Sequence, residues 1–100
     1  MTELSEIQKL VNEELKEANK KYPPFHSDHE AYAVIKEEVE ECEEDVRKME
    51  MVLSYFWSNT KRDKNSDNLI AGIKKIAMHA AAEAIQVAAM CDKALIGREK

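Results

Sequence analysis

KEEVEECEED, at residues 36–45, contains seven acidic residues in ten and decides how the chain is organised. Like charges one helical turn apart repel each other by about a few tenths of a kcal/mol per pair, so this run destabilises a helix that carries it. A cation bound to the run would remove that repulsion. The stretch therefore predicts a helix that carries a cation site.

The residues on both sides of this run have the spacing of an amphipathic helix. Apolar residues recur at alternating intervals of four and three: Ile35, Val39, Cys42, Val46, Met49, Leu53 and Phe56. At about 100° per residue this spacing forms one core-facing stripe. Glu38 and Asp45 lie directly beside the stripe, Glu41 lies slightly further round, and Glu37 further still. The other acids of the run point away, and we expect them to be solvated.

The composition fits one domain over residues 1–100, large enough for a core but small enough to gain from oligomerisation. A net charge of -5 and an isoelectric point near 5.2 argue against a nucleic-acid partner, because phosphate binding needs a basic face. No apolar run approaches the ~20 residues of a membrane span, and no signal-peptide pattern is present. Cys42 and Cys91 lack metal-binding spacing, so we expect reduced thiols and a cytoplasmic protein.

The fold class is expected to be all-α. The chain has two glycines and two prolines, and no alternating run of Val, Ile or Thr marks a strand. The first helix should stop before Tyr22-Pro23-Pro24, because proline cannot continue a helix. The second should begin at Asp28, where Ser27 can cap it, and run to about Asn59.

The remaining residues predict a loop and a third helix. Residues 58–68 are polar and basic without a period, which is typical of a loop. The third helix should begin near Ser66 or Asp67. The second helix ends in methionine and aromatic residues, a surplus that fits either a subunit interface or ordinary core. We expect a helical bundle of one short and two long antiparallel helices, completed by oligomerisation.

Glu83 is the second informative residue in the chain. It lies inside or at the edge of the apolar stripe of the third helix, and a carboxylate is almost never buried without a partner. Glu83 therefore needs a cationic side chain or a bound ion. One interpretation is an acidic solvated face on which a lysine such as Lys74 or Lys75 from a neighbour neutralises Glu83.

The other interpretation is a metal site shared by the two long helices. Packed antiparallel, these helices can bring Glu83 close to Glu38, Glu41 and Asp45. Carboxylate oxygens suit Mg²⁺ or Mn²⁺, which proteins usually hold with a few carboxylates, waters and substrate phosphates. Such an ion can clamp a pyrophosphate linkage and lower the pKa of an attacking water.

The acidic motif and its surroundings resemble a known family. Glu37-Glu38-Val39-Glu40-Glu41 has the form EExxE, and it lies between the strings SDHEAYAV and EAIQVAAM, which begin at Ser27 and Glu83. Over residues 25–95 the chain resembles the small MazG-like proteins of phages and bacteria. These are all-α nucleoside triphosphate pyrophosphohydrolases that form dimers or tetramers and bind Mg²⁺ through EExxE and a later ExxD.

The resemblance implies a set of site residues. It implies that Glu37, Glu38, Glu41 and Glu83 bind Mg²⁺ or Mn²⁺, and that Glu38 and Glu41 are catalytic. The position of the final Asp in ExxD is occupied by Gln86, a neutral amide that binds Mg²⁺ more weakly. The interval between the two motifs is also longer than the family usually shows. Both departures point to a site that holds a nucleotide but cleaves it poorly.

Further side chains are candidates for contact with a nucleotide. They are polar, basic or aromatic residues: His29, Tyr32, Lys61, Arg62 and Gln86. Each can meet a phosphate or a base, but several also have an ordinary structural interpretation. A histidine in the first helical turn, such as His29, is more often a surface or packing residue, and Lys61 and Arg62 are more typical of a solvated turn.

Three functions remain open, in the following order. The first is a Mg²⁺-dependent nucleotide pyrophosphohydrolase, favoured by the acidic motif and Glu83. The second is a non-catalytic phage protein that sequesters a nucleotide or a cyclic nucleotide immune signal, favoured by Gln86. The third is a purely structural helical oligomer, favoured by the aromatic end of the second helix.

Overall fold

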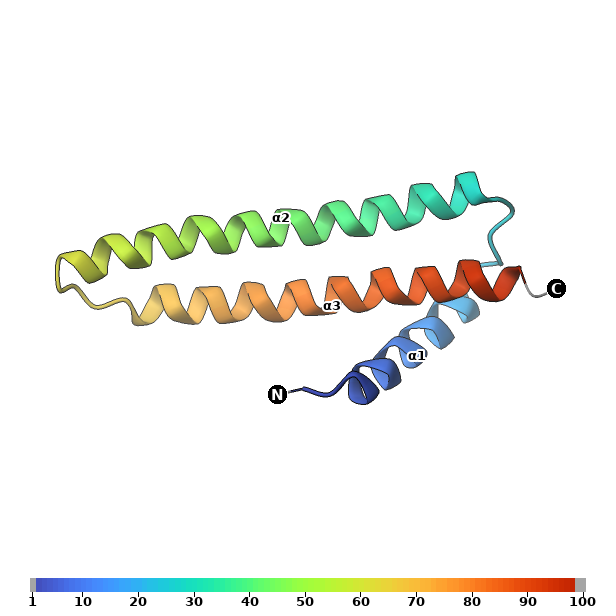
Figure 1. Ribbon diagram of the computed structural model, residues 1–100, viewed down its shortest axis with the longest axis horizontal. Helices are drawn as coiled ribbons and strands as arrows, with labels where there is room; N and C mark the ends of the chain where they lie inside the picture. The colour runs from blue at the N-terminus through green and yellow to red at the C-terminus, as the bar shows by residue number, and fades with distance from the viewer. Residues whose placement is uncertain (1, 99–100) are drawn as a thin grey trace.

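The computed structural model describes residues 2–98, which form three α-helices (Figure 1). They are α1 at Leu4–Lys21, α2 at Asp28–Lys61 and α3 at Asp67–Gly97, with 18, 34 and 31 residues. α2 and α3 lie side by side as an antiparallel hairpin, and α1 crosses the C-terminal half of α3. The structure confirms an all-α fold with one short and two long helices.

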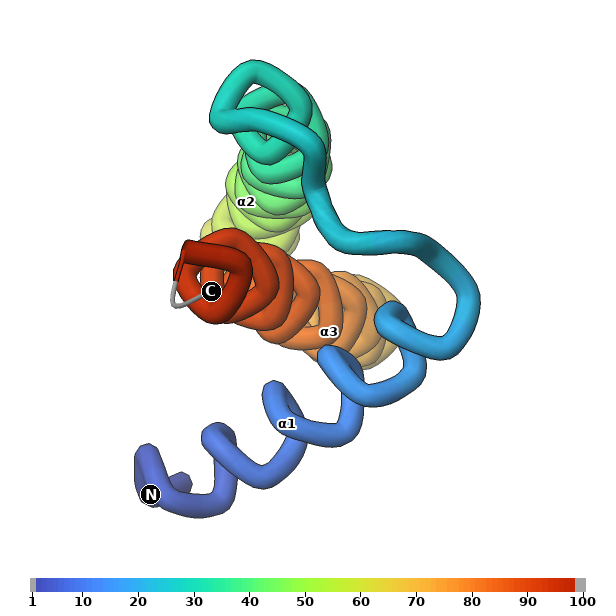
Figure 2. The backbone as a smooth tube through the Cα atoms, turned by 90° about the vertical axis from the view of Figure 1, so that its right-hand side faces the viewer, coloured from blue at the N-terminus to red at the C-terminus, as the bar shows by residue number. Residues whose placement is uncertain are grey.

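α3 is the central element of the fold. Within residues 2–98, α1 packs against α3 and not against α2. Figure 2 shows this order, with α3 lying between α2 and α1. The first half of α2 and the last half of α3 therefore lie at the end of the hairpin where α1 and the linker at residues 22–27 are also found.

The start of α2 confirms the capping prediction. The Ser27 hydroxyl accepts a hydrogen bond from the Glu30 amide at 3.2 Å, and the Glu30 carboxylate accepts one from the His26 amide at 3.4 Å. These bonds satisfy amides that have no partner inside the helix. α1 ends at Lys21, one residue before Tyr22-Pro23-Pro24, as proline chemistry predicts.

The predicted loop at residues 58–68 begins too early, because α2 continues to Lys61, whereas the start of α3 at Asp67 confirms the predicted start of the third helix. Thr60 shows the physical reason. Its hydroxyl donates to the Phe56 carbonyl at 2.9 Å, so a polar side chain hydrogen-bonds along the helix instead of ending it.

A tight connection joins the two long helices. The Asn59 side chain donates to the Asn65 carbonyl at 3.2 Å across the turn. Asp63 has a φ of 54°, in the left-handed region that Asp and Asn tolerate better than most residues. The connection therefore needs five residues, 62–66, to reverse the chain.

The apolar stripe of α2 was expected to face the core, but only one edge of it does. Val39, Val46 and Leu53 are exposed. Positions beside them face α3 instead, since Ala31 and Asp45 are the buried residues of α2. The helix is rolled so that only one edge of the stripe is covered by α3.

The described residues bury little apolar surface. Their buried hydrophobic side chains are Val11, Ala31 and Ala89. The structure measures 60 × 27 × 20 Å with a radius of gyration of 17.5 Å, against roughly 13 Å for a compact domain of this length. None of the described helices combines the length and the apolar character needed to cross a membrane. The elongated shape leaves many large apolar side chains exposed.

Candidate metal centre

Three carboxylates from two helices converge on one point. Glu38 and Glu41 lie one turn apart on α2 and face Glu83 on α3. One oxygen from each side chain lies within 4.8 Å of the others. The antiparallel packing of the hairpin produces this arrangement, because residues three apart on a helix share a face. We call these three residues the glutamate cluster.

The glutamate cluster contains buried oxygens that have no protein partner. Oε2 of Glu38 and Oε2 of Glu83 are buried and accept no hydrogen bond from any described residue. Within residues 2–98 of one chain, neither Lys74 nor Lys75 forms an ion pair with Glu83. A buried acceptor without a partner is costly, and a divalent ion is a ligand that would satisfy these oxygens.

The electrostatics of the cluster favour partial protonation. Burial raises the pKa of Glu38 above its ordinary value, and the charge of Glu41 raises it further. The pKa of Glu41 is also raised, first by its hydrogen bond with the Glu83 carboxyl and then by the Glu83 charge. Carboxylates this close resist joint ionisation. The same cause makes them a good ligand set for a cation, which would remove the repulsion.

A second polar pair lies beside the cluster. Asp45 is buried, and its Oδ2 lies 2.6 Å from Nδ1 of His79 on α3. Because an ionised carboxylate only accepts, Nδ1 carries the proton and donates. This hydrogen bond is the largest cause of a raised pKa at His79. Asp45, which we expected among the converging acids, is thus paired with His79.

His79 also faces the glutamate cluster. Its Nε2 lies 3.8 Å from Oε1 of Glu83, one turn further along α3. The register that sets Glu41 opposite Glu83 sets Asp45 opposite His79, four residues away along each helix in opposite directions. That register was the signal in the sequence that could have revealed the pair.

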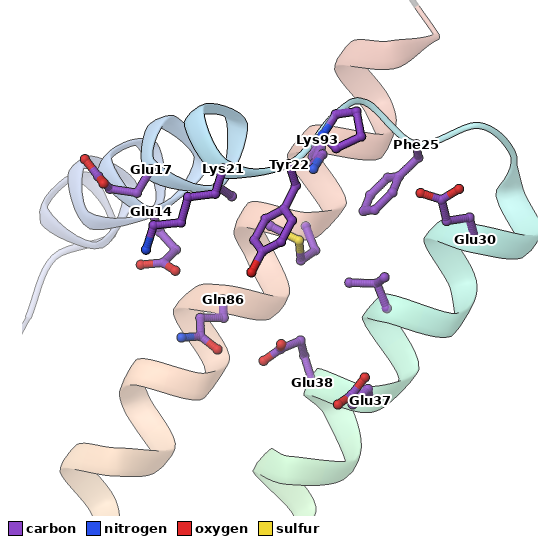
Figure 3. A pocket seen from close by; sticks show the side chains of 14 residues that line it. Glu14, Glu17, Lys21, Tyr22, Phe25, Glu30, Glu37, Glu38, Gln86 and Lys93 are labelled. Atoms are coloured by element: carbon purple, nitrogen blue, oxygen red, sulfur yellow. The ribbon is translucent and has the colours of Figure 1, made fainter.

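A cavity of about 580 Å³ opens next to Glu38 (Figure 3). It lies between the second half of α1, the linker, the first half of α2 and the second half of α3. Its labelled lining residues are Glu14, Glu17, Lys21, Tyr22, Phe25, Glu30, Glu37, Glu38, Gln86 and Lys93. Figure 3 shows Glu38 and Gln86 at one end of the cavity. Its volume lies in the range of small-molecule sites, roughly 300–1,000 Å³.

Of the other predicted site residues near this end of the hairpin, Glu37 and Gln86 line the cavity, and His29 and Tyr32 do not. Glu37 lines the cavity but is not one of the three carboxylates that lie within 4.8 Å of one another. Gln86 lines the cavity on α3. His29 and Tyr32 are exposed on the first turns of α2 and are not part of the cavity lining.

Lys61 and Arg62 lie at the opposite end of the hairpin. Twenty residues separate Lys61 from Glu41, which is about 30 Å along a helix. The Lys61 ammonium instead lies 5.8 Å from the centre of the Trp57 ring. These two basic residues cannot contact a nucleotide held by the glutamate cluster of the same chain.

Lys93 is a residue of the cavity that sequence reasoning missed. It is 7 % exposed, and its ammonium lies 4.8 Å from the centre of the Phe25 ring and 5.9 Å from that of Tyr22. The available signal was its spacing of seven from Gln86, which places both on one face of α3. That spacing does not reveal the path of the linker, so the contacts of Lys93 with the two rings could not be predicted from it.

The arrangement can bind a divalent cation at the glutamate cluster and an organic ligand in the adjoining cavity. Hard carboxylate oxygens, two of them buried without partners, suit Mg²⁺ or Mn²⁺. Comparisons of the chain with protein-family models, with curated proteins and with solved structures find no match. The interpretation of the site therefore rests on its geometry and on the motif that it contains.

Proposed function

We propose that the protein is a Mg²⁺- or Mn²⁺-dependent nucleotide pyrophosphohydrolase of the MazG-like type. One observation carries the proposal: three carboxylates from two helices converge within 4.8 Å beside a cavity of nucleotide size. Two of these carboxylates keep a buried oxygen without a partner. A bound cation would complete the site, and a nucleoside phosphate is an anionic ligand that such a cation attracts.

Each acid has a place in this proposal. Glu38, Glu41 and Glu83 would hold the ion, which would supply charge neutralisation at the phosphates and a more acidic water. Glu38 and Glu41, the catalytic residues that the resemblance implies, would accept the proton of that water in their ionised forms. Glu37 lies at the cavity wall, where it can hold a second ion or a water bound to the first.

A second candidate function is binding without cleavage. Gln86 lies in the cavity at the position of the missing acid, and a neutral amide adds no charge to the metal site. A protein with this site would sequester a nucleotide, or a cyclic nucleotide immune signal, as a phage protein can. A purely structural oligomer is the third candidate.

The proposal includes a homo-oligomer, a dimer or a tetramer, acting in the cytoplasm with both cysteines as free thiols. A groove of about 580 Å³ runs between α2 and α3, with Val39, Cys42 and Val46 on one side and Ala84 and Val87 on the other. The few buried apolar side chains of one chain leave its fold short of hydrophobic stabilisation. A helix of a second copy, packed into this groove, would supply it.

Calorimetry with Mn²⁺, Mg²⁺ and nucleoside triphosphates tests the proposal. We expect metal binding to the parent protein, none to Glu83→Gln, and unchanged binding to Glu44→Gln. Glu44 is a matched control because it lies on the same acidic run and is paired with Lys48 on the outer surface. Absence of metal binding in the parent protein would overturn the metal site.

Hydrolysis assays separate the first two functions. Release of pyrophosphate or a nucleoside monophosphate by the parent protein identifies the enzyme. Nucleotide binding without product identifies the binder, and Gln86→Asp should then create or raise hydrolysis by restoring the fourth acid. Structural oligomerisation alone would give neither metal nor nucleotide binding.

A further inference from the structure

We infer that Lys93, Tyr22 and Phe25 form a base subsite that selects nucleobases carrying a carbonyl oxygen. This inference rests on the proposed function, because it concerns the part of a nucleotide that lies away from the metal. The three side chains come from α3 and the linker and lie together at the end of the cavity opposite Glu38 and Gln86 (Figure 3).

Lys93 is a buried cation with unused donors. The ion pairs within residues 2–98 do not include it. The side-chain hydrogen bonds of these residues do not include it either. Its contacts with the Phe25 and Tyr22 rings stabilise the charge, and none of the described residues accepts a hydrogen bond from its ammonium. Because it lines the cavity, a ligand atom can be that acceptor.

The charge of the cavity indicates what kind of acceptor this is. Its lining contains more acids than bases: Glu14, Glu17, Glu30, Glu37 and Glu38 against Lys21 and Lys93. An anionic group of the ligand at Lys93 would be repelled by these carboxylates, because the proposed divalent ion lies at the opposite end of the cavity and does not offset their charge. A neutral carbonyl oxygen accepts from an ammonium without adding charge. The acceptor that fits is therefore a carbonyl oxygen.

The aromatic rings indicate that this carbonyl belongs to a flat group. Tyr22 lines the cavity and is 64 % exposed, so a face of its ring is open to a ligand. Stacking of a base on an aromatic side chain is favourable for every base. The hydrogen bond from Lys93 then adds selectivity. Uracil, thymine, cytosine and guanine carry a carbonyl oxygen at the edge of the ring, whereas adenine offers only ring nitrogens as acceptors and carries an amino donor instead.

Binding of UTP and ATP to the metal-loaded protein tests the inference, with pyrophosphate as a probe of the metal end alone. We expect the parent protein to bind UTP about tenfold or more tightly than ATP, as loss of a hydrogen bond to a charged donor implies. Lys93→Met should remove this preference and leave pyrophosphate binding unchanged. Lys93→Gln, which keeps an N–H donor, should retain part of it.

Three outcomes would overturn the inference, and each is distinct from failure of the metal site. The first is equal affinity of the parent protein for UTP and ATP. The second is a preference that persists in Lys93→Met. The third is unchanged nucleotide affinity in Tyr22→Leu, and it decides the matter if Lys93→Met does not fold. Tyr22→Leu removes the stacking surface, so it should weaken the binding of UTP and ATP alike. If the parent protein does not bind pyrophosphate in the presence of the metal, the proposed function is overturned instead.

Discussion

The two ends of the α2–α3 hairpin are built differently. The end near α1 has the cavity and the glutamate cluster, with the pair of buried Asp45 and exposed His79 nearer the middle of the hairpin. The end near the connection at residues 62–66 consists of two helices alone, and α1 does not reach it (Figure 1). Large apolar side chains are exposed at both ends, but at this end no third helix within residues 2–98 lies beside them: Met51, Leu53, Tyr55, Trp57, Ile70 and Met78.

This difference suggests that ligand binding and assembly use different parts of the same pair of helices. Polar groups that are buried without partners cost stability and persist where they have a function. Exposed apolar side chains in this number are consistent with the proposed oligomer, in which a second copy would cover them. We therefore expect changes at the cavity and the glutamate cluster to act on ligands, and changes on the exposed apolar side chains, from the groove at Val39 and Val46 to the connection, to act on assembly.

The largest effect is expected for Leu53→Glu at the two-helix end. A charge on this exposed apolar stripe should dissociate the oligomer and lower the melting temperature strongly, since each buried apolar side chain contributes about 1.5–3 kcal/mol. Sedimentation and thermal unfolding measure both effects. Ser54→Glu, at the neighbouring exposed position, is the matched control and should leave the mass unchanged. An unaltered mass in Leu53→Glu would contradict the assembly proposal.

The next effect concerns metal and stability at the other end. A divalent ion at 100 times its Kd adds about 2.7 kcal/mol, so Mn²⁺ should raise the melting temperature by roughly 10 °C. Glu83→Gln should abolish this shift, while the metal-free variant should melt above the metal-free parent because the repulsion is reduced. A Glu83→Gln protein that is less stable than the parent without metal would show that Glu83 is a packing residue.

A smaller effect is a fall in metal-free stability as the pH rises. Folding raises the pKa of Glu38 and Glu41, which favours their neutral forms, and it raises the pKa of His79, which favours its charged form. In both cases the stabilisation is present at low pH and is lost as the pH rises past the ordinary pKa, which is 4.5 for the glutamates and 6.5 for His79.

Thermal unfolding in chelator across this pH range measures the effect. Mn²⁺ should reverse the trend, because metal binding needs ionised carboxylates. Glu41→Gln should flatten the acidic part of the curve, whereas Glu40→Gln, on the outer surface and paired with Lys36, should not. Metal-free stability that rises with pH would contradict the charge state assigned to the cluster.

The smallest effect is expected for Lys61→Ala at the far tip of the hairpin. Its contact with Trp57 is exposed, so its loss should cost about 0.5–1 kcal/mol at most. Nucleotide affinity measured by calorimetry should not change, because Lys61 lies about 30 Å from Glu41. A tenfold loss of affinity would show that Lys61 of a second copy reaches the site.

Local signals predicted the boundaries of the helices at the end near α1. Proline at positions 23 and 24 and the capping residue Ser27 act through short-range chemistry that the sequence contains in full. The approach of Glu83 to Glu38 and Glu41 also followed from helix periodicity and one antiparallel pairing.

The roll of each helix and the path of the linker could not be predicted. A stripe such as Val39, Val46 and Leu53 shows that a helix has an apolar face, but it does not show which edge of that face a neighbouring helix covers. In this structure α3 covers the edge on which Asp45 lies. Lys93 meets Tyr22 and Phe25 only because the linker folds over the end of α3. Both features depend on packing between distant segments.

The continuity of α2 and α3 makes the centre sensitive to residue number. Each residue added inside α3 between Asp67 and Glu83 would rotate Glu83 by about 100°, away from its partners on α2. Seven added residues would restore its angular phase to within about 20°, but they would shift it along the axis by two turns. The connection at residues 62–66 is free of this constraint, so insertions and deletions in related genes should accumulate there and avoid the interior of the two rods.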